Sequence, residues 1–488
     1  MRTLIPARLL VVRGPNAARV AGAALAVLAV ALPVAAQPAT ALSDAVRHYV
    51  EIDDPVVALT GVQVVDGTGS PAASGQTVLI RDGRIAAVGP DADIAIPAGA
   101  RTLALAGHTV IPGLVGLHDH TFYMTRGRRV QLNFSAPRLY LASGVTTIRT
   151  TGAFSPYSEL NLKRSIQEGQ EIGPRMYITG PYLSGAGAMS QMFQVGTPAD
   201  ARRVVAYWAD EGVDWFKAYT RIGDEQLGAA IEEAHRRGVK VTGHLCSVSF
   251  QEAVALGIDN IEHGFFTSSD FVRNKQPGVC PPGVQRSLLD VDLDGEAVAA
   301  TIRAMVDAGV AMTSTLPVYE LGVPNRPPLE QRVLDMLAAG AREEYLQSRA
   351  DVAARDDSPM GTLFSKAQEF ERLFVEAGGL LAAGVDPTGM GGALPGYGDQ
   401  RNYELLLESG FSPEQVIQIM TLNGARVLGE DARFGSIEPG KLADLVVIDG
   451  DPVRREAEIR NVTLVFKEGV GYDAPALAES VRGLVGLR

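Results

Sequence analysis

Short apolar runs and amphipathic helical stretches alternate through the central part of this chain, and this alternation limits its fold more than any other feature. The clearest unit is "GVDWFKAYT", followed by the helical pattern "DEQLGAAIEEAHRRG" and the apolar run "VKVTGH". A capping box formed by Ser249 and Glu252 then predicts a short helix before "IDNIEHG". Such alternation is typical of a parallel α/β structure.

Eight such apolar runs occur within about 300 residues, which predicts a (β/α)8 TIM-like barrel. The segment over residues 319–377 is too long for one crossover, so we expect it to add helices over the barrel mouth. The eight expected strands lie near "GLVGLHDH", "GVTTIRTTG", "RMYITGPYL", "DWFKAY", "VKVTGH", "IDNIEHG", "GVAMTSTLPV" and "GLLAAGVD".

Both ends of the chain are rich in short β-type runs. Near the beginning, "QTVLIRDGRIAAVG" contains Asp82-Gly83, a strong hairpin signal. Near the end, "GSIEPGKLADLVVIDGDP" and "NVTLVFKEGVGYD" have the same texture. We therefore expect two β-rich parts, over residues 37–112 and 433–488, the second with a C-terminal helix. They enclose a barrel over residues 113–432.

The first 36 residues read as a secretory signal peptide. Four arginines precede the apolar run "VAGAALAVLAVAL", and Val34 and Ala36 supply the small residues of a cleavage site before Gln37. A membrane anchor is the alternative, but the run is short for a span. We therefore expect an exported protein, periplasmic or secreted, with no membrane attachment after cleavage.

The composition argues against nucleic acid as a partner and does not decide whether the two cysteines are bonded. Acidic residues outnumber basic ones, 56 to 44, and no basic run is interleaved with aromatic residues, so we expect no nucleic-acid binding. Cys246 and Cys280 are the only cysteines. In an exported protein they either form one disulfide or remain two buried thiols. A small molecule is the expected partner, and a homo-oligomer is compatible with the sequence.

Chemically active side chains fall where the expected strands end. His118 and His120 stand two apart in an extended run, so their imidazoles face the same side. In a barrel the carboxyl ends of the strands meet at one mouth, where active sites form. The residues that this rule brings together are His118, His120, Lys217, His244, His263 and Asp386.

Lys217 carries the most chemical information in this set. Its neighbours "VDWF" and "AY" predict burial, and an unpaired buried ammonium is costly. Asp214 stands three residues away in the same strand and therefore faces the opposite side. A buried amine of lowered pKa reacts with CO₂ to give an anionic carbamate, which can bridge two cations. Imidazoles with such oxygens suit zinc, manganese or cobalt.

The chain resembles the amidohydrolase superfamily over nearly its whole mature length. The resemblance is carried by "VIPGLVGLHDH", "IEHG", "TLNGARVLG" and "GSIEPGKLADLVVID", and it is nearest to the imidazolonepropionase-like, prolidase-type and carboxyamidase branch. It implies a barrel flanked by a small β-sandwich built from both chain ends. It also implies two divalent metal ions, for which zinc is the expected metal. His118, His120 and Asp386 would hold one, His244 and His263 the other, and carbamylated Lys217 would bridge them.

The expected reaction is hydrolysis of an amide C–N bond, of a dipeptide or an N-acyl amino acid. An activated water would attack the carbonyl carbon, and Asp386 would carry its proton to the leaving nitrogen. The alternatives are a lactonase, esterase or phosphotriesterase, a mononuclear cyclic-amide hydrolase, and a binding protein without activity. Four residues near strand ends are candidates to bind a substrate carboxylate or the oxyanion, with packing or surface roles as the alternative: Tyr219, Arg221, Arg149 and Tyr123.

Overall fold

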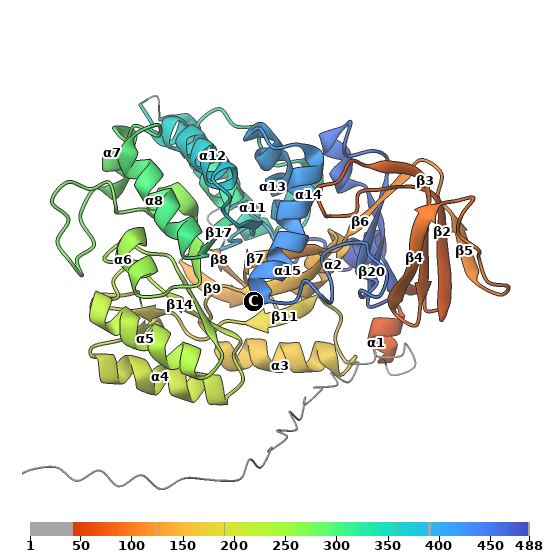
Figure 1. Cartoon of the computed structure of the whole chain (residues 1–488), viewed down its shortest axis with the longest axis horizontal. Coiled ribbons are helices and arrows are strands. Elements are labelled where there is room, and N and C mark those ends of the chain that lie inside the picture. The colour runs from red at the N-terminus through yellow and green to blue at the C-terminus, as the bar shows by residue number, and fades with distance from the viewer. Residues whose placement is uncertain (1–41, 126, 190, 356, 389–391, 487–488) are drawn as a thin grey trace, which may run out of the picture. The chain divides into compact units, whose positions relative to one another are not determined.

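The computed structural model describes residues 42–486, apart from residues 126, 190, 356 and 389–391 (Figure 1). The expected signal peptide and its cleavage site before Gln37 lie outside the described residues. None of the helices in the described part is both long enough and apolar enough to pass through a bilayer.

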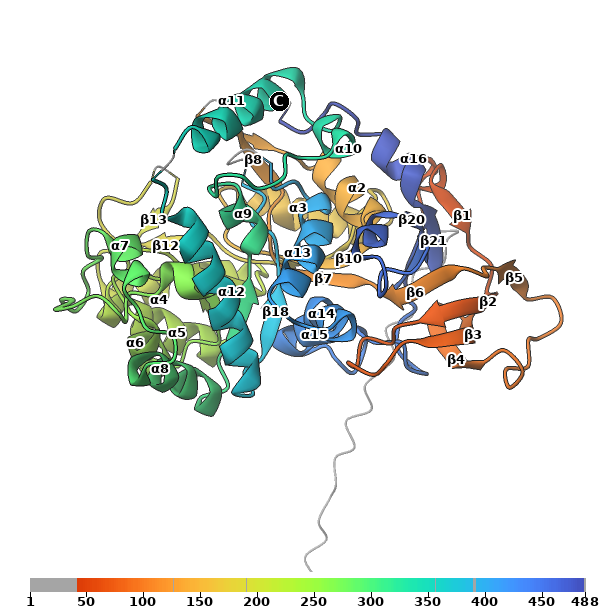
Figure 2. The same cartoon turned by 90° about the horizontal axis from the view of Figure 1, so that it is seen from above.

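Strands from both ends of the chain pair in one nine-stranded sheet (Figure 2). Its order is β1-β21-β20-β19-β6-β2-β3-β4, and β5 pairs with β2. The two β-rich ends thus come together as expected, while the division at residues 112 and 432 stays a prediction. The strands are β1 (Val50–Ile52), β2 (Val56–Val64), β3 (Ala73–Arg81), β4 (Arg84–Pro90), β5 (Arg101–Ala104), β6 (His108–Pro112), β19 (Leu445–Asp449), β20 (Val462–Lys467) and β21 (Val470–Asp473).

The register of this sheet follows its apolar pattern. Asp82 and Gly83 both have positive φ, 48° and 76°, and form the predicted turn between β3 and β4. Val57 then pairs with Ile80 and Leu59 pairs with Val78. Because alternate strand residues share a face, these four side chains pack in one buried cluster.

A strand lies in each of the eight segments where the sequence predicts one. All neighbouring pairs among them are parallel, in the orders β11-β10-β7 and β13-β12-β14-β15-β16-β17-β18. The α/β class is therefore confirmed. The eight are β7 (Leu114–Asp119), β10 (Val145–Thr150), β11 (Arg175–Ile178), β14 (Trp215–Ala218), β15 (Lys240–Gly243), β16 (Asn260–Glu262), β17 (Ala311–Ser314) and β18 (Leu381–Ala383). The short additional ones are β12 (Leu183–Ser184), β13 (Phe193–Gln194), and the antiparallel pair β8 (Phe122–Thr125) and β9 (Arg128–Gln131).

Helices follow the strands as the alternating pattern predicts. The capping box of Ser249 and Glu252 begins α6 as expected. The first group is α1 (Asp44–Arg47), α2 (Ser135–Ala142), α3 (Pro156–Gln167), α4 (Pro198–Asp210), α5 (Asp224–Arg236), α6 (Phe250–Ala255), η2 (Gly264–Thr267), α7 (Val284–Leu289) and α8 (Glu296–Asp307). After the parallel strands come α13 (Tyr397–Glu408), α14 (Pro413–Met420), α15 (Leu422–Leu428), η3 (Glu456–Arg460) and α16 (Ala474–Glu479).

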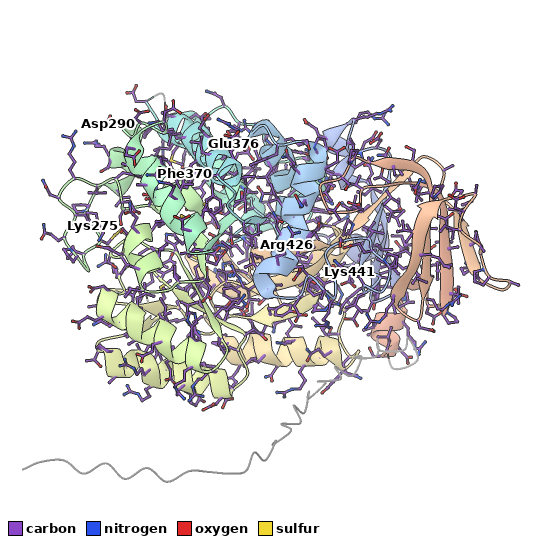
Figure 3. All side chains as sticks on the ribbon, in the orientation of Figure 1. Lys275, Asp290, Phe370, Glu376, Arg426 and Lys441 are labelled. Atoms are coloured by element: carbon purple, nitrogen blue, oxygen red, sulfur yellow. A yellow bond between two sulfur atoms is a disulfide. The ribbon has the colours of Figure 1, made fainter. Side chains whose placement is uncertain are left out.

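The long segment after β17 contributes four helices, as expected: α9 (Leu316–Glu320), α10 (Gln331–Leu334), α11 (Ala339–Ala353) and α12 (Met360–Glu376). Along α12 the apolar face is buried, with Phe370 fully inaccessible, while Glu376 at the end of the helix is exposed (Figure 3). Ser348 and Val352 of α11 and Met360 of α12 line a cavity that also contains predicted site residues. This insertion therefore forms part of the site's enclosure.

Candidate metal centre

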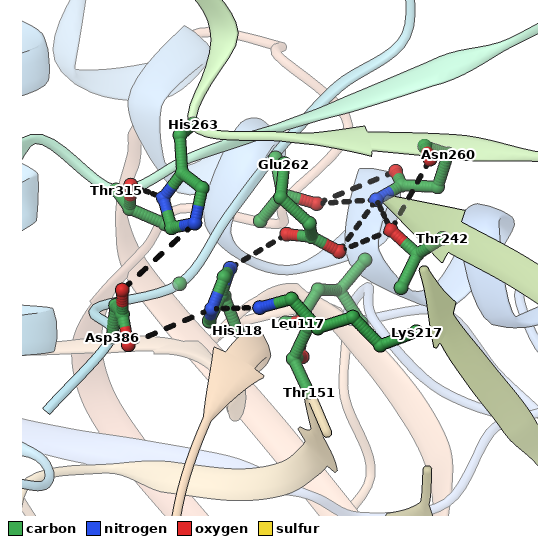
Figure 4. Close-up of polar contacts among 12 residues, drawn as sticks. Leu117, His118, Thr151, Lys217, Thr242, Asn260, Glu262, His263, Thr315 and Asp386 are labelled. Atoms are coloured by element: carbon green, nitrogen blue, oxygen red, sulfur yellow. Dashed lines mark hydrogen bonds and ion pairs between the residues drawn. The ribbon is translucent and has the colours of Figure 1, made fainter. Parts of the chain in front are cut away.

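The structure brings together all six residues that the sequence predicts as metal ligands, at the carboxyl ends of parallel strands. His118 lies in β7 and Lys217 in β14, while His120, His244, His263 and Asp386 directly follow strands or lie within three residues of one. Nε2 of His118 lies 3.0 Å from Nζ of Lys217 and 3.6 Å from Oδ1 of Asp386 (Figure 4). Nε2 of His120 lies 3.2 Å from Oδ1 of Asp386, and the rings of His244 and His263 are 4.5 Å apart.

Burial keeps the imidazoles of this centre neutral. It lowers the pKa of His120 to about 4 and that of His244 to about 3, and it lowers the pKa values of His118 and His263 as well. Burial alone would raise the pKa of Asp386, but the neighbouring histidines bring it well below its usual value. Four neutral nitrogen donors thus face a carboxylate, which is the form in which these groups bind metals.

Two observations test whether the site fits divalent cations. Ligand atoms of His118, His263 and Asp386 all lie within 4.8 Å of one another, and this nitrogen and oxygen donor set suits zinc. Nε2 of His263 is buried without a hydrogen-bond partner in the described structure, and it lies 3.9 Å from Oδ2 of Asp386. A buried ring nitrogen that has no hydrogen bond and lies near a carboxylate is suited to share a cation with it. The residues therefore fit a metal.

Lys217 is buried, with 2 % of its surface exposed, and it makes no ion pair with any residue in the described ranges. Its contacts are His118 and the rings of Tyr182 and Tyr219, at 5.6 and 5.8 Å from Nζ. Burial lowers its pKa to about 8. Asp214 instead pairs with Lys163 at 2.6 Å, so it faces away from Lys217 as the strand pattern predicts.

Two residues of the centre have left-handed backbone conformations. His263 has φ of 67° and Asp386 has φ of 56°, a region that non-glycine residues seldom occupy. The backbone N–H groups of Val385 and Asp386 both donate to the carbonyl oxygen of His118, at 3.0 and 2.8 Å. These bonds join the loop after β18 to β7, so the carboxylate and the first histidine are held together.

Glu262 is a site residue that sequence reasoning missed. Its Oε2 lies 2.7 Å from Nδ1 of His118 (Figure 4). Its Oε1 accepts a hydrogen bond from Arg149 at 2.5 Å. Thr242 and Asn260 donate to the same Oε1. Burial would raise the pKa of Glu262, but Arg149 and His118 hold it at about 2, so Glu262 is a buried anion.

Strict strand alternation would turn Glu262 away from the side that His263 faces. The positive φ of His263 breaks that alternation, so both side chains turn into the centre. The sequence signal was present, since a carboxylate directly precedes a predicted ligand. Its interpretation required the backbone conformation.

The four substrate-binding candidates differ in whether they line the cavity beside the centre. Tyr219 lines the cavity beside the centre. Arg149 does not, because it is fully buried and is held by Glu262 and by the carbonyl oxygen of Leu117 at 2.8 Å. Tyr123 is 1 % exposed and Arg221 is exposed, and neither lines the cavity. These three residues therefore do not line this cavity, and Arg149 is a structural partner of the centre.

The cavity beside the centre has a volume of about 590 Å³. Lys217, His244 and Asp386 line it, so the candidate ligands are open to a small molecule. Its other lining residues are mostly apolar: Phe122, Met124, Phe154, Tyr182, Met189, Met192, Tyr219, Val318, Tyr319, Leu321, Gly322, Val352 and Met360, with the polar Gln285, Ser348, Arg355 and Thr388.

Cys246 and Cys280 form a disulfide, which resolves the alternative left open by the sequence. Cys246 is two residues after His244, and Cys280 lies in the loop that leads to Gln285 of the cavity. The bond therefore joins a segment beside a candidate ligand to a segment of the cavity wall.

Comparison with known proteins agrees with this geometry. The family model described as "Amidohydrolase family" matches residues 109–471. Adenine deaminase 3 of Rhizobium meliloti is 24 % identical over 432 residues, which are 83 % of this chain but only 58 % of that protein. Enamidase of Eubacterium barkeri is 24 % identical over 399 residues, 78 % of this chain and 83 % of that protein.

Among solved structures, a proposed prolidase from Bifidobacterium longum superimposes with a TM-score of 0.63 and 28 % identity, covering 87 % of this chain and 98 % of that one. The family model covers well over half of the chain, and its span includes all six residues of the centre. The chain therefore belongs to the amidohydrolase family, as a hydrolase.

Proposed function

We propose that this protein hydrolyses an amide C–N bond with two divalent cations, and that these cations are zinc. The observation that carries the proposal is the convergence of four neutral histidines, one carboxylate and one buried lysine that has no ion-pair partner among the described residues. His118, His120 and Asp386 would hold one cation, and His244 and His263 the other. Bound there, the cations supply Lewis-acid chemistry toward a water molecule and the amide carbonyl.

Carbamylated Lys217 completes this proposal. The neutral amine adds to CO₂: the new N–C bond forms as one C–O π bond opens, one proton leaves the nitrogen, and the neutral side chain becomes an anion. Burial of Lys217 without an ion-pair partner favours this change, because the ammonium is poorly solvated there. A carbamate at this position would supply oxygen ligands to both cations.

Asp386 is the proposed general base. Its side chain is 16 % exposed and lines the cavity, while the other carboxylate of the centre, Glu262, is fully buried. Asp386 would take a proton from the attacking water and deliver it to the leaving nitrogen. Tyr219, whose pKa burial raises to about 12, stays a neutral donor beside the same cavity.

The proposed substrate is a dipeptide or an N-acyl amino acid. Two features support it: the likeness to the proposed prolidase, and Arg355, an exposed cation at the cavity that would neutralise a substrate carboxylate. Parallel kinetics on dipeptides, N-acyl amino acids, lactones and phosphotriesters test this choice. Rapid turnover of a lactone or phosphotriester with every amide inert would contradict it.

The finer architecture is part of the proposal. We propose that the parallel strands close as a (β/α)8 barrel and that the nine-stranded sheet folds as a small β-sandwich. Closure is supported by the bonds from Val385 and Asp386 to His118, and by the parallel bridge between Thr179 and Trp215.

Export is proposed from the arginine-flanked apolar run before Gln37. The disulfide between Cys246 and Cys280 supports it, because disulfides persist in oxidising compartments. N-terminal sequencing of protein recovered outside the cytosol should begin at or near Gln37. A cytosolic protein that retains Met1 would contradict export.

The Lys217→Ala variant tests the two-cation proposal. Without the anionic ligand that they share, the repulsion between the two dications is poorly compensated. Metal content and activity should therefore fall together. Short-chain carboxylic acids or bicarbonate should restore part of both. Lys240→Ala is the matched control, since Lys240 is also a strand lysine but donates to Val427 and does not line this cavity. Two tightly held cations and full activity in Lys217→Ala would overturn the proposal.

A further inference from the structure

Eight aromatic side chains, four of which belong to the metal centre, contact one another in a closed ring. Four are the candidate ligands His118, His120, His244 and His263. The other four are Phe122, Phe154, Tyr182 and Tyr219, which we call the aromatic arc. Successive ring centroids lie 4.5 to 5.5 Å apart: His120–Phe122, Phe122–Phe154, Phe154–Tyr182, Tyr182–Tyr219, Tyr219–His244, His244–His263, His263–His118 and His118–His120.

The arc is built by segments that follow four successive parallel strands. Phe122 follows β7, Phe154 follows β10, Tyr182 follows β11 and Tyr219 follows β14. All four line the 590 Å³ cavity together with Lys217 and Asp386. The arc is therefore a continuous wall that begins beside His120 and ends beside His244.

Further side chains extend this wall with the same chemistry. Met124, Met189 and Met192 line the cavity beside the arc, and thioethers make favourable contacts with aromatic rings. Apart from the centre itself, Arg355 is the sole charged group among the described lining residues. A small aliphatic group would leave much of such a surface in contact with water, whereas a flat aromatic group would cover it.

We propose that the substrate carries an aromatic ring that lies against the aromatic arc while its scissile amide reaches Lys217 and Asp386. This inference rests on the proposed amide hydrolysis and narrows its substrate to amides with an aryl-bearing acyl or amine group. Ring centroid spacings of 4.8 to 5.3 Å within the arc are those at which aromatic groups pack, so an added ring continues an existing pattern.

The first test compares N-acetylglycine with two substrates that each add one ring, N-benzoylglycine on the acyl side and N-acetylphenylalanine on the amine side. With the zinc-loaded enzyme, at least one aromatic substrate should have a kcat/KM at least about tenfold higher than N-acetylglycine. The side that gains identifies which product carries the ring. Equal or faster turnover of N-acetylglycine would overturn the inference.

Variants at Phe154 locate the effect. Phe154→Leu keeps an apolar side chain but removes the ring, so kcat/KM for the aromatic substrate should fall about five- to tenfold more than kcat/KM for N-acetylglycine. Phe154→Tyr should retain the preference. Phe134→Leu is the matched control, because Phe134 is 50 % exposed and does not line the cavity. An equal loss for all substrates, or the same loss in Phe134→Leu, would contradict the role of the arc.

Binding measurements separate this inference from the proposed reaction. The probes 2-phenylethanol and 1-propanol have no bond that the enzyme could hydrolyse. The first should bind the zinc-loaded protein at least about fivefold more tightly by calorimetry, and Phe154→Leu should remove the difference. Tight aromatic binding with every amide inert would contradict the proposed function alone. Amide turnover without aromatic preference would contradict this inference alone.

Discussion

The Nδ1 atom of His118 lies 2.7 Å from Oε2 of Glu262, and neither side chain has any solvent exposure. Because Glu262 is an anion, Nδ1 carries the proton and donates it to this bond. The lone pair of Nε2 then faces Lys217 and Asp386, where a cation would bind. Glu262 therefore selects the tautomer that makes His118 a ligand.

Glu262→Gln should weaken metal binding. The amide leaves Arg149 as a buried cation without its anion, and it no longer fixes the proton on Nδ1. We expect the metal dissociation constant to rise about 10- to 100-fold, with part of the activity returning at high metal concentration. Competition with a chelator measures this. Glu233→Gln is the control, since Glu233 pairs with Arg236 and Arg237 at the end of α5. An unchanged metal affinity in Glu262→Gln would contradict the role of Glu262.

Asp386→Asn should separate metal binding from proton transfer. Asparagine tolerates the left-handed conformation at this position and keeps one oxygen for a cation, but it cannot accept a proton. We expect turnover to fall about 10²- to 10⁴-fold while metal content is partly kept. Steady-state kinetics with metal analysis measure both. The control is Asp335→Asn, near the surface between α10 and α11, which should change neither turnover nor metal content. Turnover near the wild-type rate in Asp386→Asn would contradict the role of Asp386 as general base.

Glu371→Gln should change how stability depends on pH. Glu371 is 2 % exposed on α12, and burial raises its pKa from 4.5 to about 8. Its folded-state pKa exceeds its unfolded one, so its stability contribution is complete below pH 4.5 and is lost as pH rises toward 8. Glutamine does not titrate. The variant should therefore gain about 1 to 3 kcal/mol over wild type between pH 5 and pH 8.

Urea unfolding at the two pH values measures this gain as a difference between variant and wild type, so other titrating groups cancel. Glu369→Gln provides the comparison on the same helix, because Glu369 is partly exposed and pairs with Arg372. A gain that is the same at both pH values would show that Glu371 does not titrate in this range.

Breaking the disulfide should cost stability and loosen the cavity wall. Cys246 and Cys280 are 34 residues apart. Removing a disulfide that closes a loop of this size lowers the free energy of unfolding by about 2 to 4 kcal/mol. The Cys246→Ser, Cys280→Ser double variant should unfold at lower urea concentration and show a raised KM, because Gln285 follows the released segment. A phosphine reductant should reproduce these changes in wild type and have no effect on the double variant. Unchanged unfolding and an unchanged KM in the double variant would contradict this role of the disulfide.

The sequence was sufficient for those site residues whose position depends on topology alone. Strand ends in a parallel α/β fold converge, so His118, His120 and Asp386 could be placed together without coordinates. Arg149 could not be placed correctly, since its interpretation depended on which partner it meets. Glu262 supplies that partner, 113 residues away in the chain.

The surroundings of Tyr123 and Arg221 could not be predicted either. Proximity to a strand end in the sequence does not decide which way a side chain turns. Tyr123 lies in β8 and is 1 % exposed, whereas Arg221 is exposed, and neither lines the cavity. The aromatic arc was missed for the same reason, because its four members come from separate segments of the chain and become neighbours only in the folded structure.

The pairing of β6 with β19 has a consequence for the order in which the protein folds. These strands match over five positions, from His108 with Asp449 to Pro112 with Leu445, and β1 likewise pairs with β21. Strands that leave the ribosome first must therefore wait for nearly the last ones before their edges are covered. Such distant pairing is slow to form, and uncovered edges invite other chains. The nine-stranded sheet therefore stays incomplete until synthesis has passed β21. A chain that stops before Leu445 would leave β6 as an open edge.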